Sequence, residues 1–298
     1  MKPIILDFDH SVKSLEGEIR LPLSDYQKTI RFAASMRNYK KLGAYLEDQL
    51  GDHQGPVFLG SGDYHHISHL LIARQTKLLG DKRLTVVILD NHPDNMRYPF
   101  GIHCGSWVSY TAALPFVDHV HVLGITSNDI GLSHAVENRL NPLIRGKLTY
   151  WSTGVDVGWA KYLGLKNCFM SFKNIDDLVS AFISAQICQN QSIYLSIDKD
   201  VLSKATIKTN WDQGQMEMRH LQDLVVALSP CIRACDITGE VSDYQYKTLG
   251  KRLMSKLDGQ NPVPINELDS WQEEHRIFNQ MLLGLFARFC PISSSLSR

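Results

Sequence analysis

Two short acidic motifs carry the residue types and spacing of a metal site. The first begins at Asp90 and places Asp90, His92 and Asp94 at alternate positions. The second places Asp198 and Asp200 on either side of a lysine. Because side chains alternate along an extended chain, residues two apart can point the same way. Carboxylates gathered on one face repel each other unless a cation lies between them, so both motifs predict ligands for divalent metal ions.

Two histidine-containing segments could complete the same site. The segment GSGDYHH offers His65 or His66, where glycines allow a tight turn before a helix. The segment IHCG contributes His103. An imidazole titrates near neutral pH, so such a residue can bind a metal or move a proton. Each motif alone has an ordinary structural explanation as a turn, a cap or a buried histidine; their order along the chain favours one shared site.

Each cluster follows or borders a predicted element of an α/β fold. Short apolar runs predict strands at residues 3–8, 56–59, 84–89, 119–124, 148–151, 192–197 and 231–237. Helical periodicity is visible at residues 65–79, 174–189, 215–228 and 267–289. This alternation predicts a single domain over residues 1–298, with three α/β/α layers and a mostly parallel central sheet. In such sheets, reactive groups collect where strands end at their carboxyl side.

The composition excludes several functional classes. The 298 residues include 31 Lys+Arg and 31 Asp+Glu, which gives no net field to hold a polyanion, so no nucleic-acid partner is expected. No apolar run approaches the roughly 18 to 20 residues of a membrane span, and the N-terminal apolar stretch is too short for a signal peptide. The six cysteines form no CxxC pair. We expect a cytoplasmic protein with reduced thiols, no membrane partner and a small-molecule substrate.

In their order, the motifs resemble those of the arginase/agmatinase (ureohydrolase) family, GGDH, DxHxD and SxDxD. Here they read GSGDYHH, LDNHPDN and LSIDKDV, and the resemblance spans residues 56–242. It implies an arginase-like metallohydrolase domain with a cluster of two Mn²⁺ ions, in which Asp90 and Asp198 bridge the metals. The implied ligands are His65, Asp90, His92, Asp94, Asp198 and Asp200. His65 is chosen over His66 because the residues after it keep the family pattern, and both remain open.

The resemblance also implies a reaction. A hydroxide that bridges the two metals would attack the carbon of a guanidino or amidino compound and break a C–N bond. His103 would pass protons to the leaving amine. Glu240 would pair with the substrate guanidinium, although its spacing from Asp236 is one residue longer than the family's DxxE. Family members often form trimers or hexamers, which implies a homo-oligomer.

Some loops depart from the family pattern. The Asp-Pro that usually follows the second acidic motif is absent, and Met96 stands where arginases carry an asparagine that contacts the amino-acid end of the substrate. These differences remove support for arginine as the substrate. In the altered loop, Trp211 and Asp212 are candidate substrate contacts.

Three other hypotheses remain open. A histone-deacetylase-like amidohydrolase would share the fold but need one zinc ion. An arginase-fold protein that has lost catalysis would act as a binding protein. The N-terminal LDFDHSV resembles the signature of haloacid-dehalogenase-type phosphatases, with Asp7 as the nucleophile and Asp9 as the acid/base.

Overall fold

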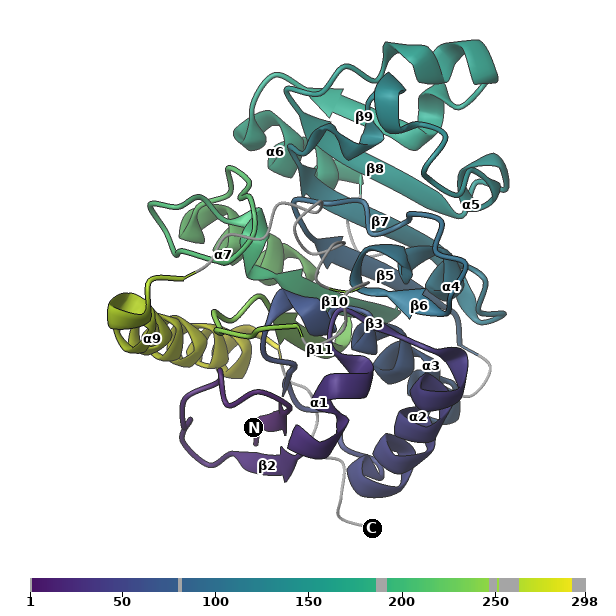
Figure 1. The fold of residues 1–298 in the computed structure, drawn as a ribbon. Helices are drawn as coiled ribbons and strands as arrows, with labels where there is room; N and C mark the ends of the chain where they lie inside the picture. Colours follow the sequence, from purple (N-terminus) through teal and green to yellow (C-terminus); the bar gives the residue numbers. More distant parts are fainter. Residues whose placement is uncertain (1, 80–81, 186–191, 247–250, 252–262, 291–298) are drawn as a thin grey trace.

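The computed structural model describes residues 2–79, 82–185, 192–246, 251 and 263–290. Nine strands form its central sheet: β1 (Ile4–Asp7), β2 (Ile19–Pro22), β4 (Val57–Phe58), β5 (Leu84–Leu89), β7 (Val117–Ile125), β8 (Leu148–Thr153), β9 (Phe169–Phe172), β10 (Ser192–Asp198) and β11 (Ile232–Thr238). Their order is β2-β1-β4-β11-β10-β5-β7-β8-β9, and all neighbours run parallel (Figure 1). A separate antiparallel pair joins β3 (Ala33–Ala34) and β6 (Ile102–His103).

Helices cover both faces of the sheet (Figure 1). One face carries α2 (Met36–Leu50), α3 (Ile67–Leu79), α4 (Val108–Ala112) and α5 (Asn141–Ile144), with α1 (Ser24–Ile30) beside α2. The other carries α6 (Ile175–Ala185), α7 (Met218–Leu228) and α9 (Ile265–Phe289). Short 3-10 helices lie at Gly62–Tyr64, Cys104–Ser106, Asn128–Ile130, Leu132–His134, Gly158–Leu163, Lys166–Cys168 and Lys199–Val201.

Each face of the sheet has its own apolar core, because side chains alternate along a strand. On β5, Val86 and Ile88 belong to the core under α2 and α3, whereas Val87 and Leu89 belong to the core under α6 and α7. Both faces of the strand are buried, as expected for a parallel sheet covered by helices. The predicted three-layer α/β/α fold is therefore confirmed.

The seven predicted strands are all present, with ends within two residues of the predicted ones. The four predicted helices are present as well, although the end of the second, at residues 186–189, lies outside the described residues. The sequence reasoning missed β2, β3, β6, β9, α1, α2, α4 and α5. The two missed strands of the main sheet form its edges, where short and partly exposed segments give weak apolar patterns.

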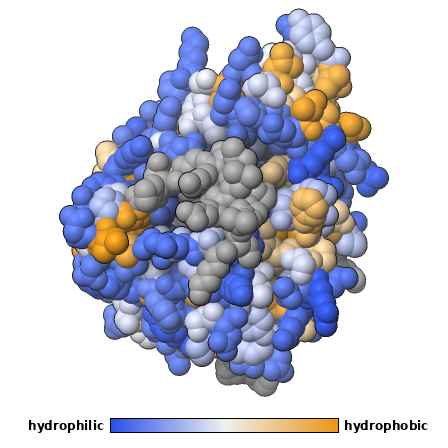
Figure 2. All heavy atoms as spheres, in the orientation of Figure 1, coloured by the Kyte–Doolittle hydropathy of each residue, from blue (hydrophilic) through white to orange (hydrophobic). Residues whose placement is uncertain are grey.

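Among the described residues, no helix is both long enough and apolar enough to cross a membrane. Figure 2 shows a mainly hydrophilic face, on which apolar side chains form a few small, separate groups. Five of the six cysteines are described, and all of these except Cys168 are buried. Cys188 lies outside the described residues.

Candidate metal centre and its cavity

The predicted ligands meet at the carboxyl edge of the sheet, between β5 and β10. From β5 the chain continues outward to β7, β8 and β9, then returns to β10 on the other side of β5 and continues to β11. Connections that leave two neighbouring strands in opposite directions open a crevice at their carboxyl ends. The ligands come from the loop after β5, from the end of β10 with the 3-10 turn behind it, and from the segment between β4 and α3.

The ligand atoms form two groups that share Asp90. One group holds His65, Asp90 and Asp198, and the other holds Asp90, His92 and Asp200. Within each group the ligand atoms all lie within 4.8 Å of one another. His65 Nδ1 is 3.2 Å from Asp90 Oδ2 and 3.3 Å from Asp198 Oδ2. A carboxylate common to both groups is placed as a bridging ligand would be.

Asp94 adds a further carboxylate to the first group. Its Oδ2 lies 3.0 Å from His65 Nδ1 and accepts a hydrogen bond of 2.7 Å from Trp107 Nε1. The backbone of Asp94 has φ of +44°, a left-handed conformation that aspartate tolerates better than most residues.

The structure separates the two histidine candidates. The His65 ring faces the carboxylates, and its Nε2 is 3.0 Å from Ser196 Oγ. Ser196 Oγ in turn donates a hydrogen bond of 2.7 Å to Asp236 Oδ1, so it can accept one from His65 Nε2–H. This leaves the Nδ1 lone pair toward the carboxylates, as a cation would require. The His66 ring instead packs against Tyr39 and does not line the cavity described below.

His92 is held by two carboxylates. Its Nδ1 lies 3.0 Å from Asp200 Oδ2, and its Nε2 lies 2.9 Å from Asp212 Oδ1. Asn91 Nδ2 donates to Asp212 Oδ2 at 3.1 Å and so fixes that carboxylate. Asp212 was expected as a substrate contact, and the structure shows that it also orients the His92 ring.

The electrostatics of the cluster favour a bound cation. Burial and the neighbouring Asp90 raise the pKa of Asp94 to about 6 and that of Asp200 to about 7. Burial and Asp200 raise the pKa of Asp198 well above its usual value. Although burial opposes it, the Asp90 and Asp94 carboxylates that face the His65 ring raise the pKa of His65 well above its usual value. Neighbouring buried carboxylates oppose one another's ionisation, and a divalent cation between them would stabilise their charged forms.

The donor set also fits the predicted ion. The candidate ligands offer carboxylate oxygens and imidazole nitrogens and no thiolate, a set that suits Mn²⁺ and similar hard ions. Asp90 Oδ2 is buried and accepts no hydrogen bond from the residues that the structure describes, so a lone pair is left for a ligand bond. The residues present therefore fit a centre of two divalent cations.

The cluster lines a cavity of about 400 Å³ with a strongly acidic wall. Besides the ligand residues, Asp129, Glu137 and Asp212 line it, and no lysine or arginine is among its described lining residues. Trp211 also lies on the wall, where its ring is parallel to that of Phe32. A concave site with this excess of negative charge attracts cationic ligands.

His103 lines the same cavity, as its predicted role requires. Its Nδ1 accepts a hydrogen bond of 2.9 Å from the Gly105 backbone, so Nε2 is the nitrogen that carries a proton in the neutral ring. Burial, assisted by the charge of Lys251, lowers the pKa of His103 to about 3. The ring is therefore neutral near pH 7. Its predicted role in proton transfer stays a prediction.

Glu240 follows the last strand, as expected, and lies in a buried cluster of polar side chains. It does not line the cavity, and its buried carboxylate lies 2.5 Å from Lys199 Nζ and 3.0 Å from His275 Nδ1. Asn279 Nδ2 donates to it at 2.8 Å. Although burial opposes it, the charge of Lys199 holds the pKa of Glu240 at about 2. The carboxylate therefore forms an internal ion pair, and the expected contact with a substrate guanidinium stays a prediction.

Gly239 shapes the backbone between Asp236 and Glu240. It has φ of +89° and packs against the end of β10. A Cβ at Gly239 would lie 2.6 Å from Asp198 Oδ1, so only glycine fits without displacing that carboxylate. The chain therefore turns tightly beside the 3-10 turn that follows β10, and Glu240 lies next to Lys199.

The N-terminal aspartates do not contribute to the cavity. Asp7 pairs with Arg20 at 3.2 Å and with His10 at 3.0 Å, and Asp9 pairs with Arg31 at 3.0 Å. Neither aspartate is among the lining residues. These ion pairs indicate a structural role for both aspartates, which does not require phosphatase chemistry.

Comparison with known proteins agrees with this fold. The chain has the α/β fold of the arginase and agmatinase ureohydrolases. Formimidoylglutamase from Bacillus subtilis superposes with a TM-score of 0.53 at 13% identity, over 95% of this chain and 87% of that one. Proclavaminate amidino hydrolase from Streptomyces clavuligerus gives 0.52 at 15%, over 92% of each chain. Arginase from Bacillus caldovelox gives 0.50 at 18%, over 87% and 98%.

The sequence comparisons are less informative. No family model matches the chain. An uncharacterized protein from Thermotoga maritima is 24% identical over 203 residues, which are 67% of this chain. This chain spans 64% of the length of that relative.

Proposed function

We propose that this protein is a binuclear metal-dependent hydrolase that cleaves a C–N bond of a guanidino or amidino compound. The observation that carries the proposal is the pair of ligand groups joined at Asp90, in a cavity at the carboxyl edge of an arginase-like sheet. A single-zinc amidohydrolase needs one ligand group, so the second group, made by Asp90, His92 and Asp200, favours two metal ions. The absence of thiolate from both groups supports Mn²⁺ as the metal.

The side chains of the protein would bind the metal ions, orient the ligand histidines and give the cavity its negative charge. Two divalent ions, when bound, would lower the pKa of a shared water and polarise the electrophilic carbon. Ser196 and Asp236 orient His65, and Asp212 orients His92. His103 presents Nε2 on the cavity wall, where it can exchange a proton with a leaving amine.

The wall charge supports a cationic substrate without a carboxylate. Two dications would balance the four ligand carboxylates, which leaves Asp129, Glu137 and Asp212 as net negative charge. No arginine or lysine is present on the described wall to receive the acid group of an amino acid. A guanidine with an amine or a neutral tail therefore fits the site better than a guanidino amino acid.

Metal content tests the centre directly. Mass spectrometry of the purified protein should give about two metal equivalents per chain, and both Asp90→Ala and Asp198→Ala should lose them. Asp269→Ala is the matched control, because that carboxylate is exposed and pairs only with Lys13 among the described residues. One zinc per chain, insensitive to Asp198→Ala, would favour the single-metal amidohydrolase.

Turnover tests the reaction. Release of urea and amine should be faster from guanidines with a terminal amine than from the matched guanidino amino acids. Glu137→Gln should reduce that preference, because it removes one wall charge and no candidate ligand. Two bound metals with no turnover of any guanidine or amidine would instead support a binding protein.

A further inference from the structure

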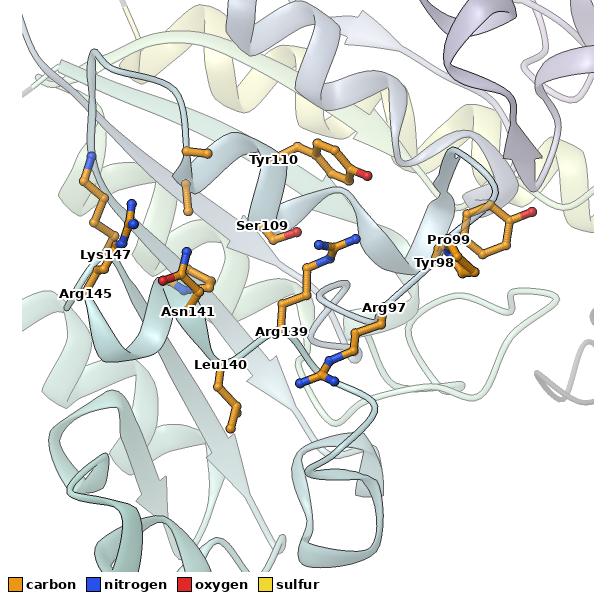
Figure 3. Close-up of a pocket in the computed structure, with 13 residues that line it drawn as sticks. Arg97, Tyr98, Pro99, Ser109, Tyr110, Arg139, Leu140, Asn141, Arg145 and Lys147 are labelled. Atoms are coloured by element: carbon orange, nitrogen blue, oxygen red, sulfur yellow. The ribbon is translucent and has the colours of Figure 1, made fainter.

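A second cavity lies beside the acidic one and carries the opposite charge. It measures about 750 Å³ and is bordered by the loop after β5, by α4 and by the segment around α5. Four cations line it, and no carboxylate is among its described lining residues. We call it the cationic pocket, and its charged residues are Arg97, Arg139, Arg145 and Lys147. Figure 3 shows Arg145 and Lys147 together at one end and Arg97 and Arg139 nearer the other.

These cations lack the acidic partners that other basic residues have. In the described parts of the chain, Arg74, Arg219 and Arg276 each pair with a carboxylate. No such pair involves a cation of the pocket within those same parts. Backbone carbonyls orient two of them instead: Arg97 Nε donates to Asn138 O at 3.3 Å, and Lys147 Nζ donates to Val117 O at 2.8 Å. Fixed like charges without counter-charges repel one another, and a bound anion would relieve that repulsion.

Arg139 is the most constrained of the four. Asn95 holds its backbone from both sides, since Arg139 N donates to Asn95 O at 2.9 Å and Asn95 Nδ2 donates to Arg139 O at 2.9 Å. Its guanidinium lies 5.5 Å from the centre of the Tyr110 ring. Its Nε is buried and has no hydrogen-bond partner among the described residues. A positioned guanidinium with an unused donor is a suitable ligand for phosphate or carboxylate oxygens.

The two cavities share a wall. Met96 and Asn138 form a β-bridge and line the acidic cavity, while their neighbours Arg97 and Arg139 line the cationic pocket. Arg97 N also donates a hydrogen bond of 2.7 Å to Glu137 O. Because each cavity repels what the other attracts, the two would hold different ligands at the same time.

We propose that the cationic pocket binds a small anion with two or more negative charges, carried by phosphate or carboxylate groups. The pocket is separate from the acidic cavity and independent of the proposed reaction there. Its cations lie at both ends, so a compact or short extended polyanion fits better than a single carboxylate.

Calorimetric titration with inorganic phosphate and with succinate, at constant ionic strength, tests this proposal. Saturable binding of at least one anion is expected, and Arg139→Gln/Arg145→Gln should weaken it about tenfold or more, because two charged donors are lost. The matched control is Arg219→Gln/Arg276→Gln, which removes the same charge from two exposed ion pairs and should leave the affinity unchanged. Binding of phosphate alone would identify a phosphoryl ligand, and binding of succinate alone a dicarboxylate.

Two results would overturn the proposal. The first is the absence of saturable binding by either anion. The second is equal affinity in the pocket variant and the control variant, because the anion would then be held elsewhere, for example by metal ions in the acidic cavity.

Discussion

Ser196 and Asp236 determine which nitrogen of His65 faces the carboxylates. The hydrogen bond from Ser196 to Asp236 makes the serine oxygen an acceptor for His65 Nε2–H. Asp236 is itself held by Ser68 Oγ at 3.0 Å and by Tyr194 Oη at 2.7 Å. Groups that orient a ligand histidine in this way fix its tautomer and strengthen metal binding.

Ser196→Ala should therefore weaken metal binding while leaving every candidate ligand in place. The expected loss of affinity is about 10- to 100-fold for the more sensitive of the two ions, measured by competition with a chelator. Ser68→Ala is the control, because it removes a different hydrogen bond from the same carboxylate. Unchanged affinity in Ser196→Ala would show that His65 needs no such support or is not a ligand.

The acidic motifs could be found from the sequence because their spacing is local. Asp90, His92 and Asp94 lie within five residues of one another, so a single loop after β5 carries all three to the site. The bond between Ser196 and Asp236 joins residues 40 apart on two neighbouring strands. Such a contact depends on strand order and register, which spacing along the chain does not reveal.

At the scale of elements, α9 is tied to the loop that carries two of the candidate ligands. Lys199 stands between Asp198 and Asp200, is fully buried, and pairs with Glu240 at the end of β11. His275 and Asn279 on α9 contact the same carboxylate. The C-terminal helix thus helps to hold the turn after β10 in place.

Glu240→Gln should destabilise the fold rather than abolish substrate binding. It leaves the Lys199 charge buried without a counter-charge, which costs about 3 to 5 kcal/mol in the free energy of unfolding, measured with urea. The double variant Lys199→Met/Glu240→Gln should recover part of that loss, because no uncompensated charge remains. Glu273→Gln, in an exposed pair with Arg276, should change stability by less than about 0.5 kcal/mol. A stable Glu240→Gln protein with a raised KM would return Glu240 to the substrate site.

The elements missed by sequence reasoning fall into two kinds. β2 and β9 are four-residue edge strands whose side chains are mostly not buried, so their apolar signal is weak. α2 did have a usable signal, since Tyr39, Leu42 and Leu46 recur at helical spacing and all are buried. The central strands were found because both of their faces are buried, which gives continuous apolar runs.

Over the whole molecule, a formal net charge of zero conceals two sites of opposite sign. The acidic cavity and the cationic pocket meet at the bridge between Met96 and Asn138. The net charge of the sequence argues against a surface that binds polyanions. It does not show that acidic and basic side chains are divided between two cavities. The lining of each cavity is assembled from several loops, whose proximity is set by the order β10-β5-β7-β8 in the sheet.

The acid stability of the whole fold should depend on a buried histidine that is not among the candidate metal ligands. His121 on β7 is buried against Phe182 of α6, and its Nδ1 accepts a hydrogen bond of 3.3 Å from Trp151 Nε1. Burial, with a smaller effect of His119, lowers the pKa of His121 from 6.5 to about 3. Between these values the unfolded chain binds a proton that the folded protein excludes. Stability is therefore lost as the pH falls from 6.5 toward 3, by about 1.4 kcal/mol per pH unit for this group.

His121→Phe should flatten this dependence. In urea unfolding with a chelator present, so that metal loss does not contribute, the fall in the free energy of unfolding from pH 7 to pH 4.5 should be smaller than in the wild type by about 2 kcal/mol. His10→Phe is the control, because that side chain is 74% exposed. If the His121→Phe variant lost as much stability over this range as the wild type, the prediction would be wrong. The buried His121 ring would then bind its proton in the folded protein as well.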